Sequence, residues 1–253
     1  MSIINANLNQ SKLIIFAGAG LSAESGLQTF RDNNGLWHKY NVHDICDIRT
    51  YHKNREIVLD FYNKRKMDIK NAEPNDAHKY IAHIQKAFGT HRVQVLTTNV
   101  DNLLTRAGVD DVINLHGSIE NTLCLSCGYE WYSYDHDYNM NETCPECSSL
   151  NTKPGVVFFF ENAPQYSNMK TILSLSGSRV LNNILIIGTS FQVIDLSRIM
   201  VGRYHPSFNK LFLIDKNPDF SKSGYFEKIY PNLASVGLKK FIELDIPNLM
   251  TNH

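Results

Sequence analysis

Four of the five cysteines form two Cys-x2-Cys pairs, Cys124/Cys127 and Cys144/Cys147, with sixteen residues between the pairs. Thiolate sulfur is a preferred ligand of zinc, and two such pairs can close a tetrahedral cage around one ion. Because four protein ligands leave no open position for water, the spacing predicts a structural Zn²⁺ rather than a catalytic one. Disulfides are the alternative, but a reducing cytosol disfavours them. We expect Cys46, which stands alone, to be a small buried apolar residue.

A glycine-rich stretch, GAGLSAESG at residues 18–26, follows the apolar run Leu13–Ala17. The run is typical of a buried parallel strand, and the glycines allow a sharp turn and a close approach to a ligand. Ser22 and Glu24 stand where a helix is expected to begin, so its N-terminus would face an anion such as a pyrophosphate. The full G-x-G-x-x-G fingerprint is missing, so an ordinary strand-to-helix turn stays open as an alternative.

Polar residues follow the next two apolar stretches. Asn99 and Asp101 come directly after the strand expected at 92–97. Open α/β sheets bind ligands at the carboxyl ends of their strands, although either residue could instead cap the helix that follows. His116 follows the stretch at 113–115. Imidazole suits proton transfer near neutral pH, and a purely structural histidine is the alternative.

The remaining pattern alternates apolar strands with helices. Strands are expected at 155–161, 184–187 and 211–214, and helices at 54–70, 75–88, 167–180 and 238–244. This alternation predicts an α/β fold with a parallel sheet covered by helices on both faces. Residues 121–153 lack any long periodicity, so we expect a small insertion that depends on its metal for stability.

The composition excludes several classes of protein. Lysine plus arginine and aspartate plus glutamate each number 25, so no overall charge recruits nucleic acid or a membrane surface. No apolar run approaches the roughly 20 residues that span a bilayer, and the first residues carry no secretion signal. We therefore expect a cytoplasmic protein that contacts neither a membrane nor, directly, nucleic acid.

In their order along the chain, these motifs resemble the sirtuin family of NAD-dependent protein deacylases. The resemblance runs from Leu13 to about Leu244 and rests on GAGLSAESGLQTFR, TTNVD, LHG, the two cysteine pairs, VVFFFE and GTS. It implies one catalytic domain over 1–253, with a Rossmann-type core at about 11–30, 90–120 and 155–245. A helical and cofactor-loop insertion would cover about 31–89, and the zinc insertion about 121–154. NAD and an acyl-lysine peptide would meet in the cleft between these parts.

The resemblance also implies roles for individual residues. His116 matches the catalytic base, and Asn99 and Asp101 match the polar pair around the nicotinamide ribose. The residues that match NAD contacts are Gly18, Ala19, Gly20, Ser22 and Ala23 in the phosphate loop, Phe30, Arg31 and Trp37 in a mobile cofactor loop, Thr98 and Val100 beside the polar pair, and Gly188, Thr189, Ser190, Asp215 and Ala234 on the adenosine side.

The family's reaction accounts for these residue types. The acyl amide oxygen attacks the ribose carbon that carries nicotinamide, and a ribose hydroxyl then attacks the resulting imidate with the help of a general base. An imidazole with a pKa near ~6.5 is matched to that second step. The products are free lysine, nicotinamide and O-acyl-ADP-ribose.

Tyr62 and Arg65 are three residues apart and share one face of the expected helix. They resemble the Tyr-x-x-Arg pair of the sirtuin subclass that removes succinyl and malonyl groups. An arginine fork and a tyrosine hydroxyl recognise the carboxylate of such acyl groups well. The alternative is a tyrosine packed on the core and an arginine in solvent. We expect desuccinylation and demalonylation alongside deacetylation.

Four positions depart from the usual family pattern. Thr98 replaces a glutamine, Leu104 a histidine, Phe160 the glycine of Phe-Gly-Glu, and Ile194–Asp195 a Tyr-Pro pair. Thr98 bears on the catalytic rate. The bulky Phe160 bears on docking of the substrate backbone as an added strand.

Two other functions remain open at this point. The first is ADP-ribosyl transfer or NAD hydrolysis on the same fold, against which His116 argues. The second is a non-catalytic, zinc-stapled module that senses NAD, against which Asn99, Asp101 and His116 argue together. The expected partners are acylated-lysine proteins or peptides, and the oligomeric state is open, a monomer being compatible with the sequence.

Overall fold

The computed structural model describes residues 11–29, 40–174, 182–189 and 209–250. The predicted contacts Phe30, Arg31, Trp37 and Ser190 lie outside the described residues, as does the Ile194–Asp195 departure. Within the described ranges, no helix is both long enough and apolar enough to cross a membrane.

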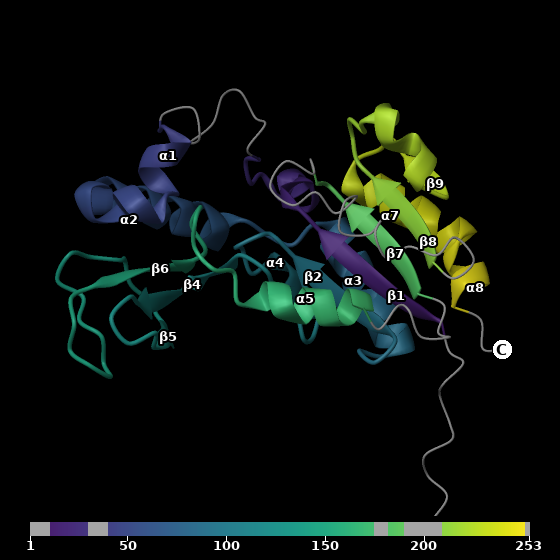
Figure 1. Ribbon diagram of the computed structural model, residues 1–253. Coiled ribbons are helices and arrows are strands. Elements are labelled where there is room, and N and C mark those ends of the chain that lie inside the picture. The colour runs from purple at the N-terminus through teal and green to yellow at the C-terminus, as the bar shows by residue number, and fades with distance from the viewer. Residues whose placement is uncertain (1–10, 30–39, 175–181, 190–208, 251–253) are drawn as a thin grey trace, which may run out of the picture.

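In the described part of the chain, six parallel strands form the main sheet, in the spatial order β3-β2-β1-β7-β8-β9 (Figure 1). They are β1 (Lys12–Ala17), β2 (Val93–Thr97), β3 (Ile113–Asn114), β7 (Asn182–Ile187), β8 (Asn209–Ile214) and β9 (Lys228–Tyr230). Counted along the chain this is the order 3-2-1-4-5-6 of Rossmann folds, in which the order reverses between β1 and β7. The predicted Rossmann-type sheet is confirmed.

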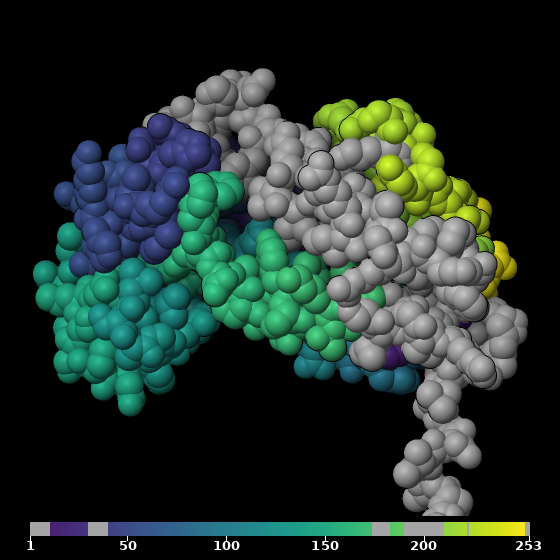
Figure 2. All heavy atoms as spheres, viewed as in Figure 1, coloured from purple at the N-terminus to yellow at the C-terminus, as the bar shows by residue number. Residues whose placement is uncertain are grey.

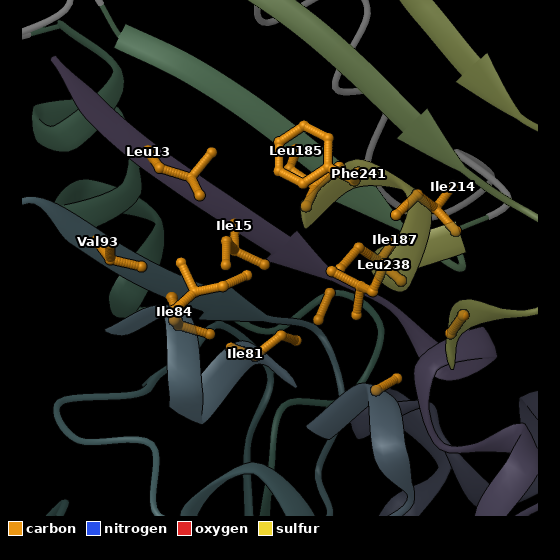
Figure 3. Packing of buried hydrophobic residues seen from close by; sticks show 14 of the residues in the cluster. Leu13, Ile15, Ile81, Ile84, Val93, Leu185, Ile187, Ile214, Leu238 and Phe241 are labelled. Atoms are coloured by element: carbon orange, nitrogen blue, oxygen red, sulfur yellow. The ribbon is translucent and has the colours of Figure 1, made fainter. Parts of the chain in front are cut away.

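Helices cover both faces of this sheet because its strands are apolar on both sides. Leu13 and Ile15 of β1 face α3 (Asp76–Phe88), α7 (Ala234–Leu244) and α8 (Ile246–Leu249), and Figure 3 shows this core. Ile14 and Phe16 face α5 (Gln165–Ser174) on the other side. The side-chain alternation of a strand thus builds two cores from one apolar run.

A second layer of the molecule packs around α2 (Ile48–Asn71), which follows the short helix α1 (Val42–Ile45). The apolar side chains of α2 meet a small antiparallel sheet of order β5-β4-β6, made of β4 (Gly117–Cys124), β5 (Glu130–Tyr132) and β6 (Thr152–Val156). We call residues 117–156, which hold this sheet and the four paired cysteines, the cysteine-bearing segment. Figure 2 shows α1 and α2 above this cysteine-bearing segment at one end of the molecule. The short strands of this segment were not predicted, and the boundaries proposed for the three parts of the chain stay a prediction.

Buried polar contacts join α2 to the cysteine-bearing segment. Lys66 is 1% exposed, and its Nζ donates to the carbonyls of Ser133 and His136 at 2.9 Å each. The hydroxyl of Tyr51 donates to the carbonyl of Thr152 at 2.6 Å. Because a buried donor left unpaired costs about 1–3 kcal/mol, these contacts fix the small sheet against α2.

Two local predictions were wrong. No α-helix begins at Ser22, because the glycine stretch continues as two 3₁₀ turns, Ala19–Leu21 and Ala23–Ser25, and ends at Gly26 with φ +84°. The run at 155–161 is not one strand, because β6 ends at Val156 and Phe160 has φ +67°. Glu161 closes this turn through a carboxylate oxygen that accepts the N–H of Phe158 at 2.6 Å.

The other elements lie close to their predicted positions. Asn75 caps α3, the helix predicted at 75–88. A short helix, α4 (Leu103–Arg106), follows Asp101, and Gly108 ends it with φ +92°. A 3₁₀ segment, Phe220–Tyr225, links β8 to β9.

Candidate functional site

The four paired cysteines come together at the end of the small sheet. Their sulfur atoms all lie within 4.8 Å of one another. Two of the Sγ–Sγ distances, Cys124–Cys147 and Cys127–Cys144, are 3.6 Å. A tetrahedral site with Zn–S bonds of about 2.3 Å separates its sulfurs by about 3.8 Å, so the cluster fits one structural zinc.

The glycine stretch after β1 packs directly against the turn after β7. The N–H of Gly20 donates to the carbonyl of Gly188 at 2.9 Å, and a Cβ built on Gly20 would lie 2.6 Å from the Cα of Gly188. Gly188 itself has φ +61°. These glycines therefore allow two loops to touch at the point where the strand order reverses, which is where Rossmann-type sheets bind nucleotides.

Glu24 has a role that the sequence did not indicate. Its carboxylate accepts the N–H of Ser235 at 2.9 Å and the hydroxyl of Ser235 at 2.6 Å. Ser235 is the second residue of α7, so Glu24 satisfies a free N–H at the start of that helix. The contact fixes the glycine stretch against α7, while Ala23 beside it is exposed.

A hydrogen-bond network centres on the buried hydroxyl of Ser22. The Ser22 Oγ donates a hydrogen bond to Oδ2 of Asp101 at 3.0 Å and accepts one from Nδ2 of Asn99 at 3.2 Å. The same Asn99 Nδ2 donates to the carbonyl of Gly18 at 3.1 Å. Oδ1 of Asp101 accepts the N–H of Leu103 at 3.2 Å, so the predicted alternative of a helix-starting role holds alongside the contact with Ser22.

His78 is a fourth member of this network and was missed from the sequence. Its Nδ1 accepts the N–H of Asn75 at 3.2 Å, so its Nε2 carries the proton and faces Ser22 Oγ at 3.4 Å. Burial lowers the pKa of His78 to about 4. The only signal in the sequence was its place three residues after the capping Asn75. We call Ser22, His78, Asn99 and Asp101 the serine network.

His116 follows β3, as predicted, and lies near the serine network. Its Nε2 is 2.9 Å from the hydroxyl of Tyr166, which comes from α5. The backbone of Thr98 also bonds its ring, but burial dominates and lowers the pKa of His116. The imidazole is therefore neutral at pH 7 and able to accept a proton.

Cys46, Tyr62 and Arg65 form a second group, which we call the arginine group. The hydroxyl of Tyr62 lies 3.3 Å from Sγ of Cys46, and both residues are buried. Arg65 is 9% exposed, and its Nη2 donates to the carbonyl of Gln28 at 3.1 Å. Its other terminal nitrogen, Nη1, is buried without a hydrogen-bond partner among the described residues. The predicted alternative of an arginine in solvent is wrong.

Burial shapes the charge of the arginine group. It lowers the pKa of Arg65, which nearby Asp101 partly restores, and it raises the pKa of Tyr62. Burial also raises the pKa of Cys46 to about 11, so its thiol stays neutral. This agrees with the prediction that Cys46 is a small buried residue. Arginine remains charged in proteins, so the group offers a cationic N–H edge that no described residue pairs, beside the neutral Cys46 and Tyr62.

One cleft of about 750 Å³ joins these groups. The predicted residues that line it are Ala19 and Ser22 after β1, Thr98–Asp101 after β2, His116 after β3, and Tyr62 and Arg65 on α2. A cleft of this size accommodates a ligand of several rings. The structure thus brings together residues that are up to 97 positions apart in the sequence, as from Ala19 to His116.

The residues predicted for the adenosine side lie at neighbouring strand ends and are not among the described residues that line this cleft. Gly188 and Thr189 follow β7. Asp215 follows β8, and its Oδ1 accepts the N–H of Asn217 at 2.8 Å. Ala234 begins α7 and is 5% exposed within the core, where it supports the sheet.

The departure at Phe160 also lies at the cleft. Its ring is 66% exposed, and the guanidinium of Arg49 lies 3.4 Å from the ring centroid. Arg49 in turn pairs with Asp47 at 2.6 Å. The bulky residue thus occupies a left-handed backbone position where glycine is usual, and it lines the cleft with a largely exposed ring.

Strand order and site together define an α/β nucleotide-binding protein with a metal-binding insertion. The Sir2 family pattern matches residues 18–195. An NAD-dependent protein deacylase of Campylobacter jejuni (strain RM1221) is 38% identical over 238 residues, which cover 94% of this chain and 97% of the relative. The chain therefore belongs to the Sir2 family.

Solved structures agree with this membership. A crystal structure of a Sir2 homologue with NAD has a TM-score of 0.78 at 27% identity, covering 95% of this chain and 91% of that chain. A Sir2 mutant with a deacetylated peptide and 3′-O-acetyl ADP ribose has a TM-score of 0.74 at 26% identity, covering 93% and 94% of the two chains.

Proposed function

We propose that this protein is an NAD-dependent protein lysine deacylase that removes acetyl, malonyl and succinyl groups and prefers the two acidic ones. Membership of the Sir2 family supports the general reaction, as does the deacylase name of its relatives. The substrates are acylated-lysine proteins or peptides, and the products are free lysine, nicotinamide and O-acyl-ADP-ribose. A cytoplasmic location, which keeps the zinc-binding thiols reduced, belongs to the proposal.

The glycine stretch, the serine network and His116 are the residues that would hold NAD. When bound, NAD supplies a nicotinamide leaving group and ribose hydroxyls that take over the acyl group. Asn99 and Asp101 would orient that ribose, because Ser22 and the Gly18 carbonyl already fix their side chains. His116 would take the proton of a ribose hydroxyl at Nε2, the nitrogen that faces Tyr166.

The preference for acidic acyl groups rests on one observation, that Nη1 of Arg65 has no hydrogen-bond partner in the part of the chain that the structure describes. A buried cationic N–H without a partner costs free energy, and an acyl carboxylate within the same cleft would satisfy it. Tyr62 is held beside it, with its ring stacked on Phe158 at a centroid distance of 5.6 Å. The pair is thus rigid before any substrate binds, which reduces the entropy cost of binding.

The zinc would act on structure alone. Its four cysteine ligands leave no open coordination position for a substrate or a water molecule. None of the four lines the cleft that contains His116 and Arg65. The metal therefore stabilises the small sheet against which α2 packs.

The proposal is tested by mass spectrometry of matched acetyl-, malonyl- and succinyl-lysine peptides incubated with NAD and the full chain. We expect all three to be deacylated, the malonyl and succinyl peptides fastest, with O-acyl-ADP-ribose formed in equal amount. Removal of acetyl alone would refute the acidic preference and keep the deacylase. Free ADP-ribose without deacylated peptide would instead support NAD hydrolysis or ADP-ribosyl transfer. No turnover with retained NAD binding would support the sensing module.

A further inference from the structure

Tyr166 contacts the one nitrogen of His116 that the proposed reaction needs. Its hydroxyl lies 2.9 Å from Nε2, and the two rings are 6.0 Å apart at 32°. Tyr166 is the second residue of α5, and fifty positions separate it from His116. Both side chains line the cleft. The contact is therefore made at the reaction site and not in the core below it.

Which of the two groups donates in this hydrogen bond follows from the contact of the other ring nitrogen, Nδ1. The backbone of Thr98 bonds the ring and acts to raise its pKa, as an accepting carbonyl does. Because Nε2 faces Tyr166, we assign this carbonyl to Nδ1, which then carries the ring proton and leaves the lone pair on Nε2. The hydroxyl of Tyr166 must then be the donor. Burial raises the pKa of Tyr166, so this hydroxyl keeps its proton at neutral pH.

We propose that Tyr166 occupies the basic lone pair of His116 in the ligand-free protein and that NAD displaces it. This inference rests on the proposed function, since Nε2 is there the atom that accepts the proton of a ribose hydroxyl. A lone pair accepts one strong hydrogen bond at a time, so Tyr166 and the ribose hydroxyl compete for it. Tyr166 is a positioning residue: it holds the ring with Nε2 towards the cleft until the cofactor binds.

Two measurable consequences follow. The hydrogen bond stabilises the neutral imidazole, so it depresses the pKa of His116 in the free protein. It must also be broken when NAD binds, so it weakens the affinity for NAD. A neutral hydrogen bond of ordinary strength corresponds to about two- to tenfold in affinity and to about 0.4–1 in pKa.

Other charged groups share the cleft and act on the same ring. They are Arg65 on α2, Asp101 after β2, and Glu161 and Lys170 before and within α5. Tyr166→Phe leaves all four in place and removes only the hydroxyl. The comparison with the wild-type chain therefore isolates the hydrogen bond to His116.

The experiment compares the full wild-type chain with Tyr166→Phe and with Tyr225→Phe, which removes an exposed hydroxyl outside the cleft. Calorimetry gives the Kd for NAD in the absence of peptide. Proton NMR gives the pKa of His116, whose signal is identified by its absence from His116→Gln. For Tyr166→Phe we expect NAD to bind about two- to tenfold more tightly and the pKa of His116 to rise by about 0.4–1. The kcat on acetyl-lysine peptide is measured alongside, to test whether the hydroxyl also acts after NAD has bound.

Several results would overturn the inference. An unchanged Kd and an unchanged pKa of His116 in Tyr166→Phe, with the thermal midpoint preserved, would show that the hydroxyl is not bound to Nε2 in solution. A kcat lowered by tenfold or more would show that Tyr166 takes part in the reaction itself. If the wild-type chain binds no NAD, the proposed function fails first, and the pKa of His116 still decides whether the hydrogen bond exists.

Discussion

Three members of the serine network, Ser22, Asn99 and Asp101, line the same cleft as the arginine group, but the two groups differ in how their polar atoms are satisfied. In the serine network, the hydroxyl of Ser22 has partners on three sides, in Asp101, Asn99 and His78. In the arginine group, counted over the described ranges, Nη1 of Arg65 is buried without a partner and the Tyr62 hydroxyl lies against the thiol of Cys46. The polar side chains of the first group are therefore held in place before a ligand binds, whereas the second group has one buried cationic N–H group that no described residue satisfies.

The two groups are also supported differently. Asn99 and Asp101 follow β2, which pairs with β1 and β3 inside the parallel sheet, and helices cover both faces of that sheet. The arginine group lies on α2 and on the loop before it, which contact the small sheet through Tyr51 and Lys66. The proposed cofactor side of the cleft therefore depends on the parallel sheet, whereas the proposed acyl side depends on the cysteine-bearing segment.

Removal of zinc should have the largest effect and should separate the two groups. In small zinc domains the bound metal contributes about 10–16 kcal/mol of folding free energy, so chelation should unfold the cysteine-bearing segment. We expect turnover of succinyl-lysine peptide to be lost while the binding of NAD, measured by calorimetry, persists. Equal loss of both would show that the sheet and the small segment form one cooperative unit.

Substitution of His116 should affect all acyl groups alike. Gln in its place keeps a polar side chain within reach of Tyr166 but cannot take a proton, and general-base catalysis contributes about 10²–10⁴-fold. We expect kcat to fall by about that factor for acetyl and succinyl peptides, with NAD still bound. A loss confined to one acyl group would remove His116 as the base.

His78 should make the stability of the serine network depend on pH. Its pKa is about 4 in the folded protein, against about 6.5 when unfolded, so the unfolded chain binds the proton first as the pH falls. Between pH 6.5 and 4 the wild-type chain should lose about 3 kcal/mol of unfolding free energy from this group.

His78→Gln is the matched variant for that measurement, because glutamine is a usual partner in a capping box and does not titrate. Denaturant unfolding of both proteins at several pH values isolates the contribution of His78. We expect a shallower pH dependence in the variant over this window. The same dependence in both proteins would place His78 in water rather than against Ser22.

Much of this architecture could be predicted from the sequence, because it depends on local patterns. Apolar runs predicted strands of the sheet, cysteine spacing predicted the metal cluster, and the helical pattern at 75–88 predicted α3. The 3₁₀ turns after Gly18 could not be predicted in this way, because Glu24, which looks like a helix-starting residue, binds the start of α7 more than two hundred positions away.

The partners of the site residues were equally beyond local reasoning. The contacts of His78 with Ser22, of Tyr166 with His116 and of Cys46 with Tyr62 join segments that only the fold brings together. Phe160 illustrates the same limit, since its β-forming neighbours predicted a strand where the carboxylate of Glu161 closes a turn. Tertiary contacts, and not propensity, decided each of these positions.

The central claim is that Arg65 binds the carboxylate of an acidic acyl group. The direct measurement is the ratio of kcat/KM for succinyl- and acetyl-lysine peptides in wild type, Arg65→Met and Lys64→Met. Lys64 lies next to Arg65 on α2 but is exposed and pairs with Asp60, so its substitution removes an equal charge outside the cleft. We expect the ratio to fall by about ten- to a hundredfold in Arg65→Met, the strength of a charged hydrogen bond, and to stay unchanged in Lys64→Met. An equal loss on both peptides in Arg65→Met, or an unchanged ratio, would contradict the claim.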